Sequence, residues 1–133
     1  MNRTPDLAKA RSLSKNALDS FLSTRDSGSG SARFLIKNYY SCVIEYCQAI
    51  LAAEGIVLHG RDHHKEMIDM LGEMGILDQY LMSVLDNLRR IRNDIQYYGT
   101  KSDLDIQAFY DLNKGNIQAI ILRLQERSQT LIP

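Results

Sequence analysis

The segment LDQYLMSVLDNLRRIRNDIQYY, residues 77–98, has the most regular hydrophobic pattern of the chain. Its apolar residues recur at alternating steps of four and three, at Leu77, Leu81, Val84, Leu88, Ile91, Ile95 and Tyr98. In an α-helix this spacing places the side chains along one stripe, as a helix in a bundle requires. We therefore predict a helix over residues 77–98 that buries the whole stripe, Tyr98 included, and ends at Gly99.

Four further segments show helical periodicity, and we predict helices over residues 4–24, 32–54, 62–75 and 102–128. Thr4 before Pro5, Asp62 and Ser102 are the expected N-terminal caps, and Gly55 is the expected stop of the second helix. The last helix is expected to bend at Gly115 and to bury Leu104, Phe109, Leu112, Ile117, Ile120, Ile121 and Leu124.

The fold predicted from these segments is all-α. No segment alternates with period two, so we expect no sheet. Residues 1–133 are predicted to form a single domain, an antiparallel up-down helical bundle of four long helices and one short helix. Residues 26–31, DSGSGS, are the expected flexible connection between the first two helices.

Composition excludes several function classes. Lys and Arg number 16 and Asp and Glu number 16, so the molecule as a whole is not attracted to nucleic acid or to a membrane, and any such attraction must be local. No apolar leader and no run near the roughly 18 apolar residues of a membrane span are present, and we predict a cytoplasmic protein. Cys42 and Cys47 project about 140° apart on one helix and are predicted to be reduced core residues. Residues 26–31 lack the lysine of a phosphate-binding loop, and no cofactor is predicted.

The candidate site is the end of the helix over residues 77–98. There the sequence concentrates polar and aromatic residues, namely Arg89, Arg90, Arg92, Asn93, Asp94, Tyr97 and Tyr98. An arginine offers a planar fork of donors that suits phosphate, and a tyrosine ring can stack on a base. The alternative is that the arginines lie on a solvated face, where the helix dipole favours cations near the C-terminus.

Three stretches in this order resemble the HEPN family, the nucleotide-binding domains of higher eukaryotes and prokaryotes. They are NYYSCVIEYCQAILAAEG (38–55), DHHK (62–65) and RNDIQYYG (92–99). The resemblance covers the second to fourth predicted helices in full and the first and last in layout only. It implies a homodimer in which paired Arg-x4-6-His motifs face a shared cleft. In that cleft the arginine holds a phosphate of RNA, and the histidine serves the 2′-hydroxyl as acid or base without a metal.

Arg92 and Asn93 match the first half of that motif, but the histidine is missing. The places that the family allows for it hold Tyr97, Tyr98 and Gly99. An unperturbed tyrosine titrates near pH 10, whereas a general base at neutral pH should titrate near 7. The form Arg-Asn-Asp-Ile-x-Tyr is also similar to a tyrosine-bearing version of the family. The resemblance therefore implies binding of RNA or a nucleotide, with Arg92, Asn93 and Tyr97 as the candidate catalytic residues if cleavage occurs.

Ideal helix geometry separates Arg92 from Tyr97, because residues five apart project about 140° from each other. Arg90, Asn93 and Tyr97 are spaced by three and four and are expected to share one face.

His63 and His64 open the third predicted helix. The simplest interpretation is capping or packing, and a second is that His64 substitutes in space for the missing motif histidine. A metal site with His59 and Glu66 is a further alternative, although the spacing matches no H-E-x-x-H pattern. No metal is predicted.

Ser102-Asp-Leu-Asp105 is similar to the Asp-x-Asp of minimal nucleotidyltransferases, which are frequent partners of HEPN proteins. The Gly-Ser turn and the sheet that such enzymes need are not predicted, so a helix cap is favoured. A nucleotidyltransferase would then be a separate partner chain, as in a toxin-antitoxin pair. The alternative function is a non-catalytic module that binds another protein, or a structural bundle.

Overall fold

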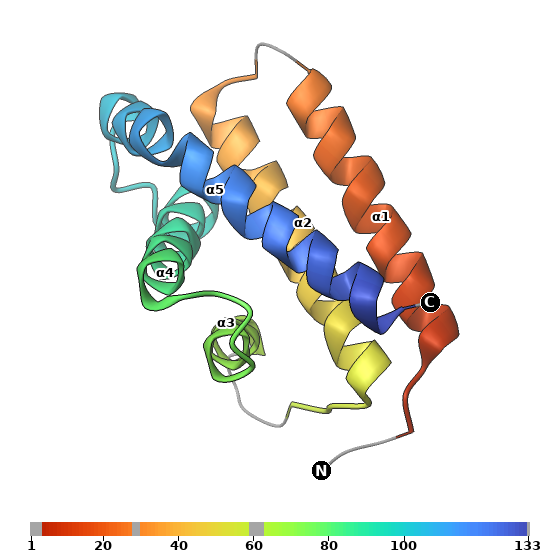
Figure 1. The fold of residues 1–133 in the computed structure, drawn as a ribbon. Coiled ribbons are helices and arrows are strands. Elements are labelled where there is room, and N and C mark those ends of the chain that lie inside the picture. The colour runs from red at the N-terminus through yellow and green to blue at the C-terminus, as the bar shows by residue number, and fades with distance from the viewer. Residues whose placement is uncertain (1–3, 28–29, 59–62, 133) are drawn as a thin grey trace.

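The computed structural model describes residues 4–27, 30–58 and 63–132, and these residues are almost entirely helical (Figure 1). The helices are α1 (Leu7–Asp26), α2 (Ala32–Glu54), α3 (His63–Glu73), α4 (Gln79–Asn93) and α5 (Asp103–Leu131). A π-helical turn, η1 (Asp94–Tyr98), continues α4. No strand occurs in the described ranges, so the predicted all-α class is confirmed.

Side-chain caps fix where α2 and α5 begin. The Ser31 hydroxyl accepts a hydrogen bond from the Phe34 amide, and the Ser102 hydroxyl accepts one from the Asp105 amide, as predicted for Ser102. Gly55 ends α2 in the left-handed conformation with φ of 68°. The predicted bounds of α2 are confirmed.

The predicted start of α1 at Thr4 is wrong by a few residues. Asp6 caps this helix instead, and its carboxylate accepts a hydrogen bond of 3.0 Å from the Lys9 amide. The Asp6 amide donates to the carbonyl oxygen of Ala52 at 2.9 Å, which ties the chain before α1 to the end of α2.

The predicted start of α4 at Leu77 is also early. Asp78 is the N-cap and accepts from the Leu81 amide at 2.8 Å, so Leu77 lies in the preceding turn, where it is still buried in the core. Asp62, the predicted cap of α3, lies outside the described residues.

Helix α2 is the central element, and it contacts α1, α3, α4 and α5. Its buried residues cover most of the helix surface, and the more exposed residues follow one stripe through Phe34, Lys37 and Ser41. Cys42 and Cys47 are among them, and both are free thiols, as predicted.

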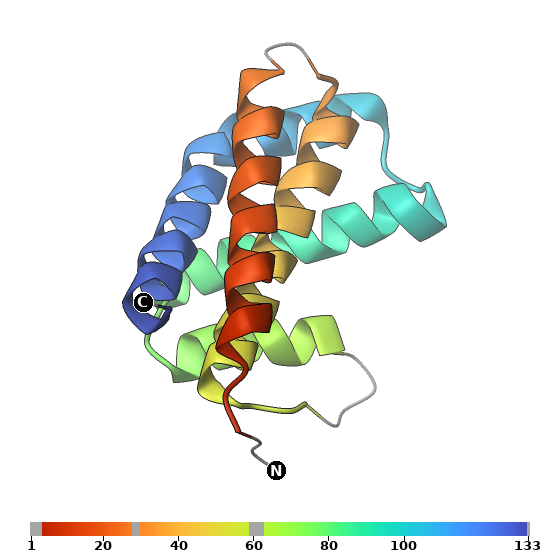
Figure 2. The ribbon, with the colours of Figure 1, turned by 90° about the vertical axis from the view of Figure 1, so that its right-hand side faces the viewer.

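The axes of α1, α2 and the second part of α5 are roughly aligned, and α3 and α4 lie across them (Figures 1 and 2). An ion pair of 2.6 Å between Arg33 and Asp103 joins the starts of α2 and α5, and Figure 1 shows both helices running from there toward the same end of the bundle. The hydroxyls of Ser14 and Ser128 hydrogen-bond at 2.7 Å and join α1 to the end of α5. This crossed arrangement brings the start of α3 and the end of α4 to the same side of α2.

The predicted burial of Leu104, Leu112 and Tyr98 is wrong. Leu104 and Leu112 are 82% and 81% exposed, and Tyr98 is 71% exposed. In the first turns of α5 the core position belongs to Ile106, which is fully buried, and both leucines project from the other half of the helix. The later apolar residues of α5, at 117, 120, 121 and 124, are buried as predicted.

Figure 2 shows that α5 changes direction between its pale blue first part and its dark blue second part, so the helix is bent. None of the helices in the described part of the chain is long and apolar enough to span a membrane.

Candidate functional site around Arg92

The end of α4 is shaped by the π-helical turn. The Gly99 amide donates to the Asp94 carbonyl oxygen at 2.6 Å, an i→i+5 bond, and Gly99 then adopts a φ of 65°. A π-helical turn inserts an extra residue into the helical register and is frequent at functional sites. Here it changes which side chains of the segment meet.

Asp94 stabilises the exit from this turn. Its buried carboxylate accepts hydrogen bonds from the Thr100 hydroxyl, from the Thr100 amide at 3.1 Å and from the Lys101 amide at 2.8 Å. The Thr100 hydrogen bond, followed by the amide bonds and the charge of Lys101, lowers the pKa of Asp94 below its ordinary value. This carboxylate, predicted as a ligand group, is thus occupied by the backbone that follows the helix.

Arg92 lies over two aromatic rings. Its guanidinium carbon is 5.1 Å from the centre of the Tyr40 ring in α2 and 5.7 Å from the centre of the Tyr97 ring in η1. Both distances fall in the range of cation–π attraction. The expectation that Arg92 and Tyr97 point apart is therefore wrong, because the π-helical turn breaks the ideal α-helical spacing on which it rested.

The three arginines of this segment have different partners. Arg89 and Arg90 both pair with the carboxylate of Asp86, each at 3.1 Å. Arg92 donates at 3.1 Å to the side-chain oxygen of Asn93, which is neutral. Within the described residues we find no carboxylate paired with Arg92. Its half-buried charge is therefore balanced by aromatic faces and an amide rather than by an anion.

Tyr40 also contacts His64, at the start of α3. The Tyr40 hydroxyl and His64 Nδ1 are 3.2 Å apart, and the two ring centres are 5.7 Å apart. Tyr40 is only 1% exposed. The fold thus brings two sequence-predicted site residues, Arg92 and His64, against one buried tyrosine that the sequence analysis did not select.

Tyr97 and Tyr98 are both exposed, and their rings form an edge-to-face pair with centres 6.4 Å apart. Tyr97 covers Arg92 from the solvent side, whereas Tyr40 meets it from the core. Asn93 is half-buried and fixes one edge of the guanidinium. The guanidinium is held by the two rings and by one hydrogen bond, and its remaining N–H groups suit an anion.

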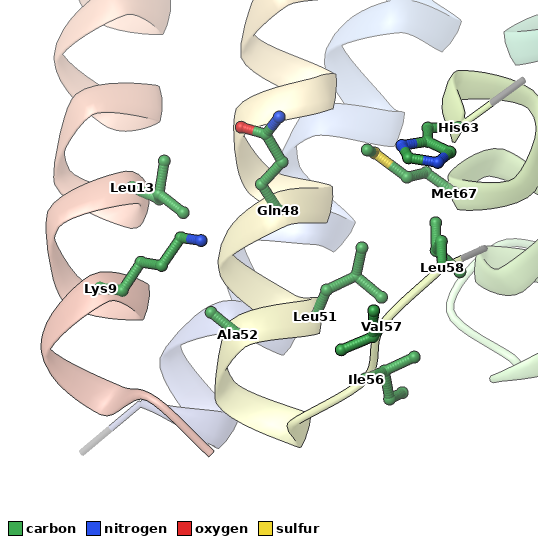
Figure 3. A pocket seen from close by; sticks show the side chains of 10 residues that line it. All are labelled: Lys9, Leu13, Gln48, Leu51, Ala52, Ile56, Val57, Leu58, His63 and Met67. Carbon is green, nitrogen blue, oxygen red and sulfur yellow. The ribbon is translucent and has the colours of Figure 1, made fainter. Parts of the chain in front are cut away.

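His63 lies in different surroundings from His64. It lines a hollow of about 370 Å³ between α1, α2, the segment 56–58 and α3, together with Lys9, Gln48 and Met67 (Figure 3). Neither Arg92 nor His64 lines this hollow. His59, considered as a metal ligand, lies outside the described residues, and the described residues contain no cluster of three or more metal-ligand side chains.

Comparison of the chain with protein-family models, with curated proteins and with solved structures finds no match. The candidate site therefore depends on the residues and contacts described above.

Proposed function

We propose that the chain is a HEPN-like helical bundle that binds RNA or a nucleotide at Arg92. The observation that carries the proposal is the half-buried Arg92, which contacts the rings of Tyr40 and Tyr97 and has no carboxylate partner among the described residues. Arginine is well suited to phosphate because its fork of donors matches two phosphate oxygens. The exposed rings of Tyr97 and Tyr98 offer stacking surfaces for a base beside that phosphate.

Titration of the purified chain with a fluorescent single-stranded RNA of mixed sequence tests this proposal. We expect Arg92→Ala to weaken binding roughly tenfold or more, because a charge-assisted hydrogen bond contributes about 1.5–3 kcal/mol. Arg90→Ala is the matched control, since Arg90 is exposed on the same helix and already paired with Asp86. Equal losses in the two variants would show that only general charge matters.

The catalytic form of the proposal is a metal-independent endoribonuclease in which Arg92, Asn93 and Tyr97 contact the reacting phosphate. It predicts RNA cleavage in the presence of a chelator, abolished by Arg92→Ala. An intact mixed RNA pool after prolonged incubation with concentrated wild-type chain would rule out cleavage and leave binding as the function.

We further propose a cytoplasmic homodimer in which two copies of Arg92 face each other across a two-fold axis. A separate nucleotidyltransferase chain, encoded beside this one, is the proposed partner in a toxin-antitoxin pair. Sedimentation of the chain alone, and with such a neighbour-encoded protein, tests the two assemblies separately.

A second candidate function is a non-catalytic interaction module, and one observation favours it. Leu104 and Leu112 project from the same half of α5 and are almost fully exposed. Exposed apolar side chains that gather on one face often mark a protein interface. This function predicts that the double variant Leu104→Asn, Leu112→Asn loses its association with the partner protein, measured by sedimentation. Arg92→Ala should leave that association unchanged.

A further inference from the structure

Three side chains from three helices meet at one point of the bundle. Tyr40 of α2 is in contact with Arg92 of α4 through its ring and with His64 of α3 through its hydroxyl. The tyrosine is buried, with Arg92 over its ring and His64 at its hydroxyl. A buried ring with few open rotamers holds its partners in place better than an exposed one does.

We propose that Tyr40 is a positioning residue that sets Arg92 and His64 to contact the same phosphate group of a nucleotide or of single-stranded RNA. The inference rests on the proposed function and adds a shared support for the two groups. In this arrangement Arg92 and His64 touch the ligand, and Tyr40 acts only through them.

The ring of Tyr40 positions Arg92. The guanidinium carbon lies over the rings of both Tyr40 and Tyr97, and Asn93 accepts a hydrogen bond from one N–H group. The orientation of the remaining N–H groups is therefore fixed before a phosphate arrives. Such preorganisation reduces the side-chain entropy that binding would otherwise cost.

The hydroxyl of Tyr40 positions His64. Because Nδ1 is engaged by this hydroxyl, we place the proposed phosphate contact of the imidazole at Nε2. A tyrosine hydroxyl can donate to a neutral Nδ1 or accept from a protonated one. The hydrogen bond thus persists when the imidazole gains a proton, and the ring orientation does not change with its charge.

Tyr40→Phe separates the two roles, because phenylalanine keeps the ring beneath Arg92 and removes only the hydroxyl. The measurement is the affinity for adenosine monophosphate and for a single-stranded RNA in four proteins: wild type, Tyr40→Phe, His64→Gln and the double variant. We expect each single change to weaken binding about threefold to tenfold, the range of one neutral hydrogen bond. The affinity of the double variant should be no lower than that of the weaker-binding single variant, because both changes disrupt the same contact between Tyr40 and His64.

A spectroscopic readout distinguishes positioning from a general loss of structure. The nitrogen and proton NMR signals of the His64 imidazole should shift in Tyr40→Phe without ligand, while the signals of His63, which lines a different hollow, stay in place. Tyr40→Leu, which removes the ring as well, should abolish the Arg92-dependent part of the affinity. Tyr40→Phe should retain that part.

The outcomes separate this inference from the function on which it rests. One outcome would show that only the role of Tyr40 is wrong. In it the wild type binds phosphate ligands and Arg92→Ala prevents binding, but the fold-losses of affinity in Tyr40→Phe and His64→Gln multiply in the double variant. Unchanged affinity in Tyr40→Phe would overturn it as well. If the wild type binds neither probe, the proposed function fails, and the assignment of Tyr40 fails with it.

Discussion

Asp86 determines which arginine of α4 keeps its charge available. One carboxylate pairs with both Arg89 and Arg90, which follow it by three and four residues, the spacing at which helical neighbours meet. Arg92 is on a different part of the helix surface, where Tyr40 replaces a carboxylate as its partner. The pairing with Asp86 can be predicted from sequence spacing. The contact with Tyr40 cannot, because it joins two helices far apart in the chain.

The two cysteines provide a residue-level prediction. Burial raises the pKa of the Cys47 thiol to about 12, and burial also raises the pKa of Cys42. The folded state therefore favours the neutral thiols, and this contribution to stability is lost as the pH rises above the ordinary thiol pKa of about 8.5. At pH 8 we expect a thiol reagent such as dithionitrobenzoate to react with the folded chain only at its rate of unfolding.

In urea both cysteines should react at the rate of a free thiol, which is the control for reagent access. Fast reaction of either cysteine in the folded chain, without loss of helical circular dichroism, would contradict the burial of α2.

At the scale of elements, the π-helical turn is the feature that sequence periodicity misses most clearly. The stripe from Leu81 to Ile91 fits an ideal α-helix, and its buried members form one side of α4. The same spacing, extended to Tyr98, predicts a core residue and is wrong, since the i→i+5 bond at Gly99 changes the register. That register depends on how Asp94 binds residues 100 and 101, which hydrophobic spacing does not encode.

Asp94→Asn should reveal how much this turn depends on charge. The lowered pKa of Asp94 means that its contribution to stability is present above the ordinary carboxyl pKa and is lost as the pH falls through the folded-state pKa. We expect the variant to unfold at a lower temperature than wild type at pH 7, and the difference to shrink below about pH 4. A melting difference that stays constant from pH 7 to pH 2 would show that the charge is irrelevant.

Two glycines with equally open surroundings should respond in opposite directions to alanine. A Cβ atom at Gly99 or at Gly115 would meet nothing within 4 Å, so crowding does not distinguish them. Gly99 has a φ of 65°, where a Cβ costs roughly 1–2 kcal/mol, whereas Gly115 lies inside α5, where alanine is better than glycine by roughly 0.5–1 kcal/mol. Urea unfolding should therefore show Gly99→Ala destabilised and Gly115→Ala stabilised.

At the scale of the whole molecule, the class of the fold and most helix bounds follow from local sequence, but the grouping of the site residues does not. Caps and apolar spacing predict where helices begin and end, as Ser102 at the start of α5 and Gly55 at the end of α2 illustrate. The meeting of Tyr40, His64 and Arg92 depends on α3 and α4 crossing the same side of α2. That crossing is decided by how the buried faces of all the helices fit together, which periodicity within one segment cannot predict.

The start of α5 tests this packing most directly, because two apolar residues in one turn have opposite surroundings. Ile106 is fully buried and Leu104 is almost fully exposed, although the sequence pattern had predicted Leu104 as the buried one. Ile106→Ala should lower the free energy of unfolding by about 2–5 kcal/mol, the cost of a cavity in a packed core. Leu104→Ala should change it by less than about 0.5 kcal/mol, as is usual for a surface substitution. Urea unfolding at low protein concentration measures both, and repetition at high concentration reveals whether Leu104 is covered in an assembly. If Leu104→Ala lowered the free energy of unfolding as much as Ile106→Ala at low protein concentration, Leu104 would also be buried in the core, contrary to the structure.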